Sequence, residues 1–305
     1  MKCKAVILAS TCLILLAGCS RLTHMPVESS NSSMLASSQE GRKVATKLIT
    51  YSNLFDQPTQ EAVKSKMVAS LPEAAVLAFF EQVQFYNQHV PTDSFVQADF
   101  ATSRSLIPDY DVAAISEKWT SQFPTFPGYN CRLTSFGLLK ELVSVASTDD
   151  YDDHLLFIDN EAITQAPDPY QLTAEEEKAF RTIFGAVATE NVTDHQVHIE
   201  KVQDYWNKKG VKFHTGKAKM VSVWMHDQLD EQQTKLFIGH VGVLIPTGKK
   251  YLFVEKISFE EPYQVLLFKS KQAIGDYLLD KYDVDTTGAT KPFLMENDQA
   301  FSPQD

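Results

Sequence analysis

Cys131 is the residue whose type and surroundings best suit covalent chemistry. The chain has four cysteines, and the other three, Cys3, Cys12 and Cys19, lie in or at the end of an apolar N-terminal segment. The remainder of the chain therefore carries one thiol without a partner, whereas cysteines of exported proteins usually pair. Because an exposed lone thiol is easily oxidised, its presence favours a reactive role over that of an inert, buried cysteine.

The residues around Cys131 predict that its thiol lies at the start of a helix. Asn130 is a favoured N-cap residue, and an amphipathic run follows it to about Ser147. In the first turn the helix dipole stabilises a thiolate, and Arg132 adds a positive charge. The sequence therefore predicts an activated nucleophile.

His240 is the best candidate for a general base among the eight histidines. It stands in the apolar segment 237–243, where Gly239 and Gly242 leave room for another group beside the imidazole. A histidine in such a strand loses hydration unless a polar partner meets it. The alternative is a core histidine that is satisfied by a partner and performs no chemistry.

A predicted hairpin offers that partner. Its strands, 236–245 and 251–258, flank the turn 246–249, and pairing Ile245 with Lys250 places His240 directly opposite Glu255. Opposite residues have Cβ atoms ~5 Å apart. The carboxylate could then hold one ring nitrogen and aim the other at the thiol. A slip of one residue would turn Glu255 to the other face as a surface residue.

The remaining pattern predicts an α+β fold. Helices are expected before the strands, and the change of period near residue 220 marks the beginning of an antiparallel sheet rather than of a doubly wound one. A capping box at Thr173 opens one helix, and Gly210 ends another. The expected helices are 58–70, 72–89, 131–147, one from Thr173, 194–209 and 270–282, and a strand is expected at 220–225.

The N-terminus predicts export and lipidation. Two lysines and an apolar stretch to Ala17 form a secretory signal, and Leu16-Ala17-Gly18-Cys19 resembles the lipobox of bacterial lipoproteins. The resemblance implies a lipid on Cys19 and a membrane anchor. The anchor would lie in the outer membrane of a Gram-negative host, or on the outer face of the cytoplasmic membrane of a Gram-positive one. An ordinary secreted protein cleaved nearby is the alternative.

Three segments follow from this organisation. Residues 1–18 are the signal peptide, and residues 19–43 are the lipidated cysteine and a serine-rich flexible tether. Residues 44–305 form a single α+β domain with a helical insertion around 150–215.

Charge and spacing argue against several classes of partner. The formal net charge is −11, and losing the signal lysines leaves 26 basic against 39 acidic side chains, so nucleic acid is not expected as a partner. His195 and His198 lack a fixed third ligand, and the acidic loop 149–153 lacks the spacing of an EF-hand. Neither a metal nor a cofactor is expected; both sets are interpreted as solvated surface.

The order of the candidate residues resembles the papain-like cysteine hydrolases. A cysteine leading a helix, a strand histidine in His240-Val-Gly-Val and a polar residue on the next strand are closest to the NlpC-type cell-wall endopeptidases and related amidases. The resemblance implies that Cys131 is the nucleophile, His240 the base and Glu255 the residue that orients it. It also implies a papain-like fold, in which the cysteine helix packs on a small antiparallel sheet. Peptidoglycan peptides or envelope proteins would be the substrates.

The chain departs from that pattern in three ways. Ser-Gly does not follow Cys131, the gap to His240 is long and holds helices, and no glutamine stands just before the cysteine. The oxyanion donor would then be the Cys131 amide with one further side chain, for which Tyr129 and Asn53 are the candidates.

Nearly the whole domain also resembles a bacterial lipoprotein family defined as a domain of unknown function (number forty-three hundred). That family carries no assigned activity, so a non-catalytic binding or accessory lipoprotein on the same scaffold remains an alternative, as does acyl or amide transfer by the same residues. The matching stretches are Tyr51-Ser-Asn-Leu54, Gly128-Tyr-Asn-Cys-Arg132, Ile238-Gly-His240, Gly242-Val-Leu-Ile245, Glu255-Lys256, Glu261-Pro-Tyr-Gln264, Pro292-Phe293 and Met295-Glu-Asn-Asp298.

Overall fold

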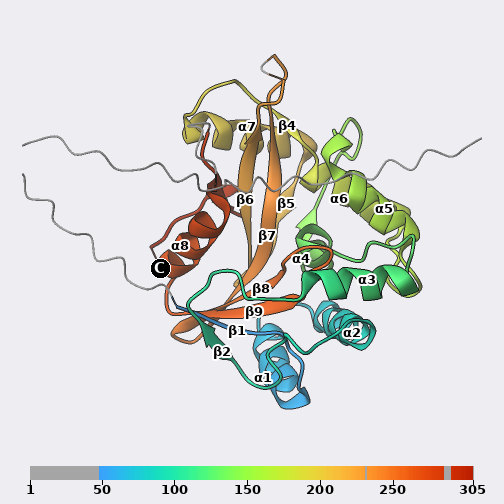
Figure 1. Cartoon of the computed structure of the whole chain (residues 1–305). Coiled ribbons are helices and arrows are strands. Elements are labelled where there is room, and N and C mark those ends of the chain that lie inside the picture. Colours follow the sequence, from blue (N-terminus) through green and yellow to red (C-terminus); the bar gives the residue numbers. More distant parts are fainter. Residues whose placement is uncertain (1–47, 231, 285–289, 305) are drawn as a thin grey trace, which may run out of the picture. The chain divides into compact units, whose positions relative to one another are not determined.

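A computed structural model describes residues 48–230, 232–284 and 290–304 (Figure 1). Its α-helices are α1 (Gln57–Met67), α2 (Glu73–His89), α3 (Val112–Gln122), α4 (Cys131–Leu139), α5 (Phe157–Gln165), α6 (Ala174–Phe184), α7 (His195–Lys209) and α8 (Lys271–Tyr282). Short 3₁₀ helices occupy Lys140–Leu142 and His154–Leu156. The strands are β1 (Ile49–Ser52), β2 (Ala101–Ser103), β3 (Val143–Ser144), β4 (Val187–Ala188), β5 (Lys212–Phe213), β6 (Lys219–Asp227), β7 (Lys235–Thr247), β8 (Lys250–Lys256), β9 (Tyr263–Phe268), β10 (Phe293–Glu296) and β11 (Gln299–Ala300).

Most of the strands form one antiparallel sheet. Its order is β11-β10-β6-β7-β8-β9-β1-β2, and β4 pairs with one end of β7. The predicted α+β class is therefore confirmed. The expected order of helices before strands was incomplete, because β1 precedes every helix and enters the same sheet as the later strands.

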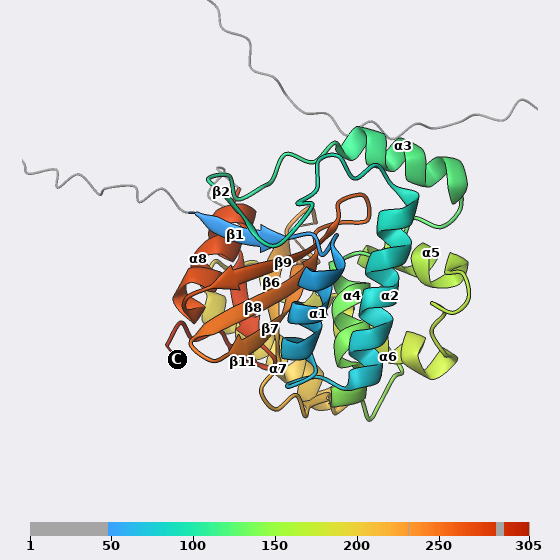
Figure 2. The same cartoon turned by 90° about the horizontal axis from the view of Figure 1, so that it is seen from below.

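Two hydrophobic cores lie on the two faces of this sheet. The larger one joins α1–α7 to side chains such as Val241 and Val243 of β7. The smaller one joins α8 to the opposite face, which includes Leu244 and Phe253. Figures 1 and 2 show α4 on one side of the strands and α8 on the other. The sheet thus separates the cysteine helix from α8.

Local signals placed several helix ends correctly. The capping box of Thr173 with Glu176 is present, and Gly210 ends α7 in the left-handed conformation with φ +63°. The cysteine helix, however, ends at Leu139 rather than near Ser147. Val143 and Ser144 pair instead with β5, because a β-branched residue at the end of an amphipathic run can gain more from strand pairing than from another helical turn.

None of the helices within residues 48–230, 232–284 and 290–304 is both long and apolar enough to span a bilayer.

Candidate active site

Asn130 fixes the beginning of α4 by two hydrogen bonds. Its Oδ1 accepts from the backbone N–H of Leu133 at 3.0 Å, which is the predicted cap, and its Nδ2 donates to Asp159 Oδ1 at 2.8 Å. Cys131 is consequently the first residue of the helix. Its side chain is not exposed, as an easily oxidised thiol would be, because the residue retains 5% of its accessible surface.

Arg132 joins α4 to both α5 and β7. Its Nε and one terminal nitrogen donate to the two oxygens of the buried Asp159 at 3.0 and 2.6 Å. The other terminal nitrogen donates to the carbonyl oxygen of Ile238 at 2.8 Å. Asp159 offsets much of the arginine charge, so Arg132 is a weaker support for a Cys131 thiolate than its position alone suggested.

His240 lies in a gap along one edge of β7. On that edge β4 pairs with residues 235–236 and β8 pairs with residues 243–247, which leaves residues 237–242 without a neighbouring strand among the described ones. The N-terminal end of α4 meets this gap, as the Arg132–Ile238 hydrogen bond demonstrates. The gap lets a side chain of the helix approach the imidazole.

A β-bulge turns His240 toward the α8 side of the sheet. Val223 pairs with His240 but Trp224 pairs with Ile238, so Gly239 is the extra residue. Ile238 and Val241 therefore both face the larger core, although they are three residues apart. Without the bulge, His240 would share the face of Ile238.

The hairpin register differs from the prediction by two residues. Thr247 pairs with Lys250 and Val243 with Val254, so Ile245 does not face Lys250. A two-residue turn, in which Gly248 has φ +67°, replaces the expected turn at 246–249 because such turns match the twist of the strands. Because a shift of two residues preserves the face, Glu255 still lies on the same side as His240.

The structure brings His240 and Glu255 into direct contact. His240 Nε2 lies 2.6 Å from Glu255 Oε2, and both side chains are at most 1% exposed. The other carboxylate oxygen accepts from Gln264 Nε2 at 3.0 Å and from the hydroxyl of Tyr277 at 2.8 Å. The carboxylate is thus held by groups from β9 and α8 as well as by the imidazole.

The thiol of Cys131 lies close enough to His240 for each group to shift the pKa of the other, so Cys131, His240 and Glu255 are together named the relay. Burial alone would raise its pKa, but the charge of His240 and a hydrogen bond from its ring outweigh burial and lower the pKa of Cys131. Burial likewise disfavours the imidazolium, yet Glu255 and Cys131 together raise the pKa of His240 to about 9. Since Nε2 faces Glu255, Nδ1 is the nitrogen left for the thiol.

Glu255 remains ionised despite complete burial. Desolvation raises its pKa, but the positive charges of Lys281 and His240 and the hydrogen bond from Tyr277 lower it to about 2. The charges of the three groups therefore favour a Cys131 thiolate and a His240 imidazolium beside an ionised Glu255. The ring of Tyr282 stacks on the imidazole with centroids 4.7 Å apart, which further fixes its plane.

Gly239 and Gly242 leave room for side chains of adjacent strands rather than for the thiol. A Cβ atom on Gly239 would lie 2.4 Å from the sulfur of Met225, and one on Gly242 would lie 2.3 Å from the Phe253 ring. The expectation that they open space for a group beside the imidazole was wrong in this respect. They make room for side chains of adjacent strands.

The side chains of the two oxyanion candidates, Asn53 and Tyr129, already donate hydrogen bonds to other groups. Asn53 is buried, and its amide N–H groups donate to the Tyr110 hydroxyl at 2.8 Å and to the Tyr263 carbonyl at 3.0 Å. The hydroxyl of Tyr129 donates to the carbonyl of Tyr170. Neither is brought to the thiol by any contact of the described residues, so the backbone amide of Cys131 is the remaining predicted donor.

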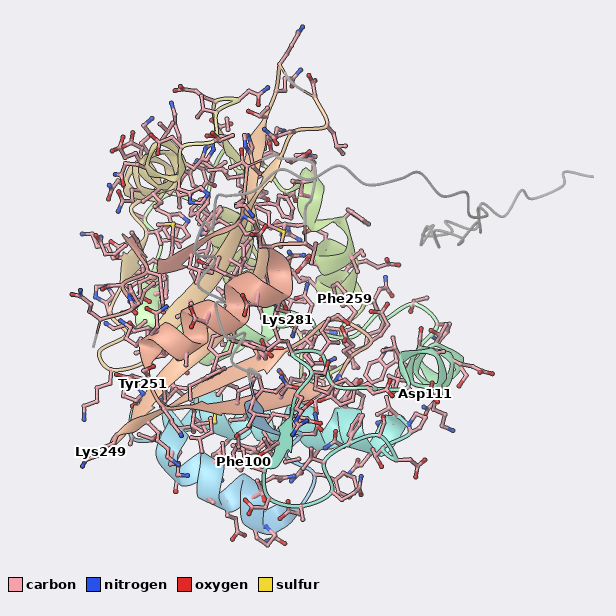
Figure 3. The ribbon with its side chains drawn as sticks, turned by 60° about the vertical axis from the view of Figure 1, so that its left-hand side comes forward. Phe100, Asp111, Lys249, Tyr251, Phe259 and Lys281 are labelled. Atoms are coloured by element: carbon pink, nitrogen blue, oxygen red, sulfur yellow. The ribbon has the colours of Figure 1, made fainter. Side chains whose placement is uncertain are left out.

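Lys256, a buried lysine next to the relay, was not predicted from the sequence. Lys256 Nζ donates to the carbonyl oxygens of Ser258, Phe259 and Glu261, and it lies 4.1 Å from the centroid of the Tyr86 ring. Burial is the main reason that its pKa is lowered to about 7. Lys256 therefore curls the β8–β9 loop, whose Phe259 is labelled in Figure 3. It has no N–H left over for a substrate.

The other residues singled out by the sequence lie apart from the relay. His198 is buried rather than solvated, with Thr189 Oγ1 at 2.7 Å and the Val192 carbonyl at 2.9 Å from its two ring nitrogens. In the acidic loop, Asp152 forms an ion pair with Lys235 at 2.7 Å. In the described part of the chain, no group of three or more His, Cys, Asp or Glu residues could hold a metal ion. Cys19 lies outside the described residues.

The relay is almost fully buried, because Cys131 is 5% exposed and the side chains of His240 and Glu255 are at most 1% exposed. The main hollow near it is a groove of about 260 Å³ between α2, α4 and residues 169–172, which reaches Tyr129. Neither Cys131 nor His240 lines it, nor do they line the aromatic hollow of about 210 Å³ beside α3 and Phe126.

Sequence reasoning also missed Asp159, Tyr277 and Lys281. Tyr277 and Lys281 are four residues apart on α8, a spacing that places both on one face of a helix, so periodicity could have paired them. Asp159 carries no comparable signal, because nothing in its neighbourhood indicates that it meets Asn130 and Arg132.

Comparison with known proteins yields one match. The family described as Domain of unknown function (DUF4300) matches residues 50–301. No curated protein and no solved structure matches the chain.

Proposed function

The chain belongs to this DUF4300 family, whose description names no activity, and from the geometry of its site we propose that it is a papain-like cysteine hydrolase of the cell envelope. One observation carries the proposal: the free cysteine Cys131 at a helix N-terminus, the imidazole of His240 and the ionised carboxylate of Glu255 lie together in one buried cluster. A nucleophile, a base and a residue that orients the base are the three parts that such catalysis needs. The lipobox at Cys19 would anchor the domain to a membrane, and the chain's envelope location rests on that segment.

The reaction follows from the roles of the three side chains. The Cys131 thiolate attacks the carbonyl carbon of an amide, and the backbone N–H of Cys131 donates to the oxyanion that forms. His240 passes its Nδ1 proton to the leaving amine, which departs and leaves a thioester on Cys131. His240 then removes a proton from water, and the resulting hydroxide attacks the thioester, which releases the acid and restores the Cys131 thiolate beside the His240 imidazolium. Glu255 holds Nε2 and stabilises the imidazolium throughout.

Peptide stems of peptidoglycan, or envelope proteins, are the proposed substrates. The test is turnover of purified muropeptides and of an unfolded protein substrate by the full chain and by its Cys131→Ala variant. Hydrolysis that disappears in the variant, while circular dichroism stays unchanged, supports the proposal. Turnover retained by Cys131→Ala would sink it. Repeating the assay with an added amine separates transfer from hydrolysis, because only transfer yields a new amide.

A non-catalytic binding or accessory lipoprotein is the second candidate. The burial of Cys131 and its absence from the main cavities favour this reading. It predicts a thiol that stays unreactive toward iodoacetamide at neutral pH and a stable partner in the envelope. Fast stoichiometric labelling of Cys131 would argue against it.

A further inference from the structure

Helix α8 supplies a second layer of polar contacts behind the relay. Tyr277 donates its hydroxyl hydrogen to Glu255 Oε1 at 2.8 Å and accepts a hydrogen bond from Lys281 Nζ at 2.9 Å. Lys281 Nζ also lies 3.8 Å from Glu255 Oε1. Figure 3 shows Lys281 at the end of α8, where the helix lies over the strands.

Lys281 is buried for a reason that packing alone does not explain. The residue is 9% exposed, and its ammonium lies 5.2 and 5.4 Å from the ring centroids of Tyr277 and Tyr282. Burying an ammonium is costly unless an anion meets it. Glu255 is that anion, and it is also the one that holds His240.

We propose that Lys281 is a positioning residue of the site, and that its ammonium keeps Glu255 ionised so that Glu255 can hold the imidazolium of His240. This inference rests on the proposed function. Lys281 touches neither the thiol nor a substrate; it acts through Tyr277 and Glu255.

Counting charges supports this role. The active form carries a thiolate on Cys131 and a carboxylate on Glu255, balanced by the imidazolium of His240 and the ammonium of Lys281. Removing the ammonium leaves one excess negative charge in a buried site, which promotes uptake of a proton. A proton on Cys131 removes the nucleophile directly, and a proton on Glu255 removes the counter-ion of the imidazolium. Either way the thiolate fraction falls.

The other titratable groups facing Glu255 cannot replace Lys281. Burial raises the pKa values of Tyr110, Tyr277 and Tyr282, so these phenols stay neutral. The amide of Gln264 carries no charge. Arg132 is held by its own carboxylate, Asp159. Lys256, next to the relay, is held by three carbonyl oxygens of the β8–β9 loop. Among the described residues, Lys281 and His240 are the cations whose charges lower the pKa of Glu255.

The test is the pH dependence of iodoacetamide alkylation at Cys131 in the full chain, quantified on the Cys131 peptide by mass spectrometry. Lys281→Met should raise the apparent pKa of the thiol and slow alkylation at neutral pH about tenfold per pKa unit. Lys281→Arg should restore the wild-type profile. The matched control is Lys271→Met, because Lys271 lies on the same helix in an ion pair with Glu296, away from the relay.

Two further measurements keep the inference falsifiable. If Lys281→Met does not fold, Tyr277→Phe, which removes only the bridging hydroxyl, should shift the profile in the same direction. NMR titration of the Glu255 carboxyl gives a readout independent of thiol reactivity, and its pKa should rise in Lys281→Met because the charge of Lys281 lowers it. Profiles that coincide with those of Lys271→Met would overturn the role of Lys281. A wild-type thiol with the pKa of a free cysteine would instead refute the proposed function.

Discussion

His240 Nε2 lies 2.6 Å from Glu255 Oε2, although the two residues are not paired in the β7–β8 ladder. The ladder ends at the pair of Val243 and Val254, so both side chains belong to the stretch just beyond it. There the edge of β7 has no neighbouring strand in the described part of the chain, and the N-terminus of α4 comes close instead. The same gap that interrupts the sheet therefore creates the site at which a thiol can meet the imidazole.

The first prediction concerns the reactivity of Cys131. In the wild type, the thiol should titrate below the value of ~8.5 for a free cysteine, because the His240 imidazolium outweighs burial. In His240→Gln only burial and the compensated Arg132 charge remain, so the pKa should rise above the free value. Alkylation of the Cys131 peptide at pH 7 should slow at least about tenfold. Identical pH profiles for both proteins would mean that the ring does not activate the thiol.

The second prediction concerns stability as a function of pH. The pKa of Glu255 is lowered from 4.5 to about 2, so its stabilisation is present above pH 4.5 and is lost as the pH falls toward 2. The pKa of His240 is raised from 6.5 to about 9, so its contribution is present below pH 6.5 and is lost as the pH rises toward 9. The contribution of this pair to the free energy of unfolding, measured with urea, should therefore be greatest between about pH 4.5 and 6.5.

Glu255→Gln should flatten both sides of that curve. The substitution removes the acidic group itself, and it also removes the charge that most strongly raises the pKa of His240. Curves for the variant and the wild type that differ only by a constant offset would contradict the coupling between the two side chains.

The third prediction concerns the N-cap of α4 and its effect on the reactivity of Cys131. Asn130→Ala removes an N-cap, which costs about 1 kcal/mol, and it also leaves Asp159 without one of its donors. Cys131 alkylation should change as well, because the first turn of α4 loses its anchor. Thr173→Ala is the matched control, since it removes the capping box of α6 and should lower stability without altering alkylation. Equal effects of both variants on alkylation would show that the cap of α4 does not position the thiol.

The fourth prediction concerns packing around His240. Gly242→Ala places a Cβ atom 2.3 Å from the Phe253 ring and should lower the free energy of unfolding by about 1–3 kcal/mol. Gly239→Ala meets the flexible end of Met225 and should be less destabilising. Gly137→Ala, inside α4 with no atom within 4 Å of the new Cβ, should stabilise by about 0.5–1 kcal/mol. Urea unfolding of the three variants checks the order, and a Gly242→Ala variant as stable as the wild type would contradict it.

Elements with strong local signals were predictable. The capping box of Thr173, the end of α7 at Gly210 and the cap at Asn130 depend on residues within one helical turn, so their chemistry is readable without the fold. The hairpin of β7 and β8 was also expected, but its register was two residues off. Turn geometry decides the register, and the sequence around Gly248 is compatible with more than one turn.

Contacts between segments far apart in the sequence could not be predicted from sequence patterns. Along one edge, β7 pairs with β4 at its beginning and with β8 at its end. Nothing in the sequence of β7 indicates at which residue either pairing ends. Asp159 meets Arg132 across 27 positions, and Lys281 meets Glu255 across 26. Such contacts form only when whole helices pack, and local periodicity does not specify that packing.

The sequence by itself determined the types of the reacting groups: the thiol of Cys131, its place after a helix cap, and a strand histidine and a carboxylate on one face of a hairpin. Tertiary structure alone decided that these three meet, that the thiol is buried rather than exposed, and that Lys281 lies behind the carboxylate. Residue type and short-range spacing are local properties that the chain carries unfolded. Burial, and with it every pKa of the relay, exists only once α4 and α8 enclose the sheet from its two faces.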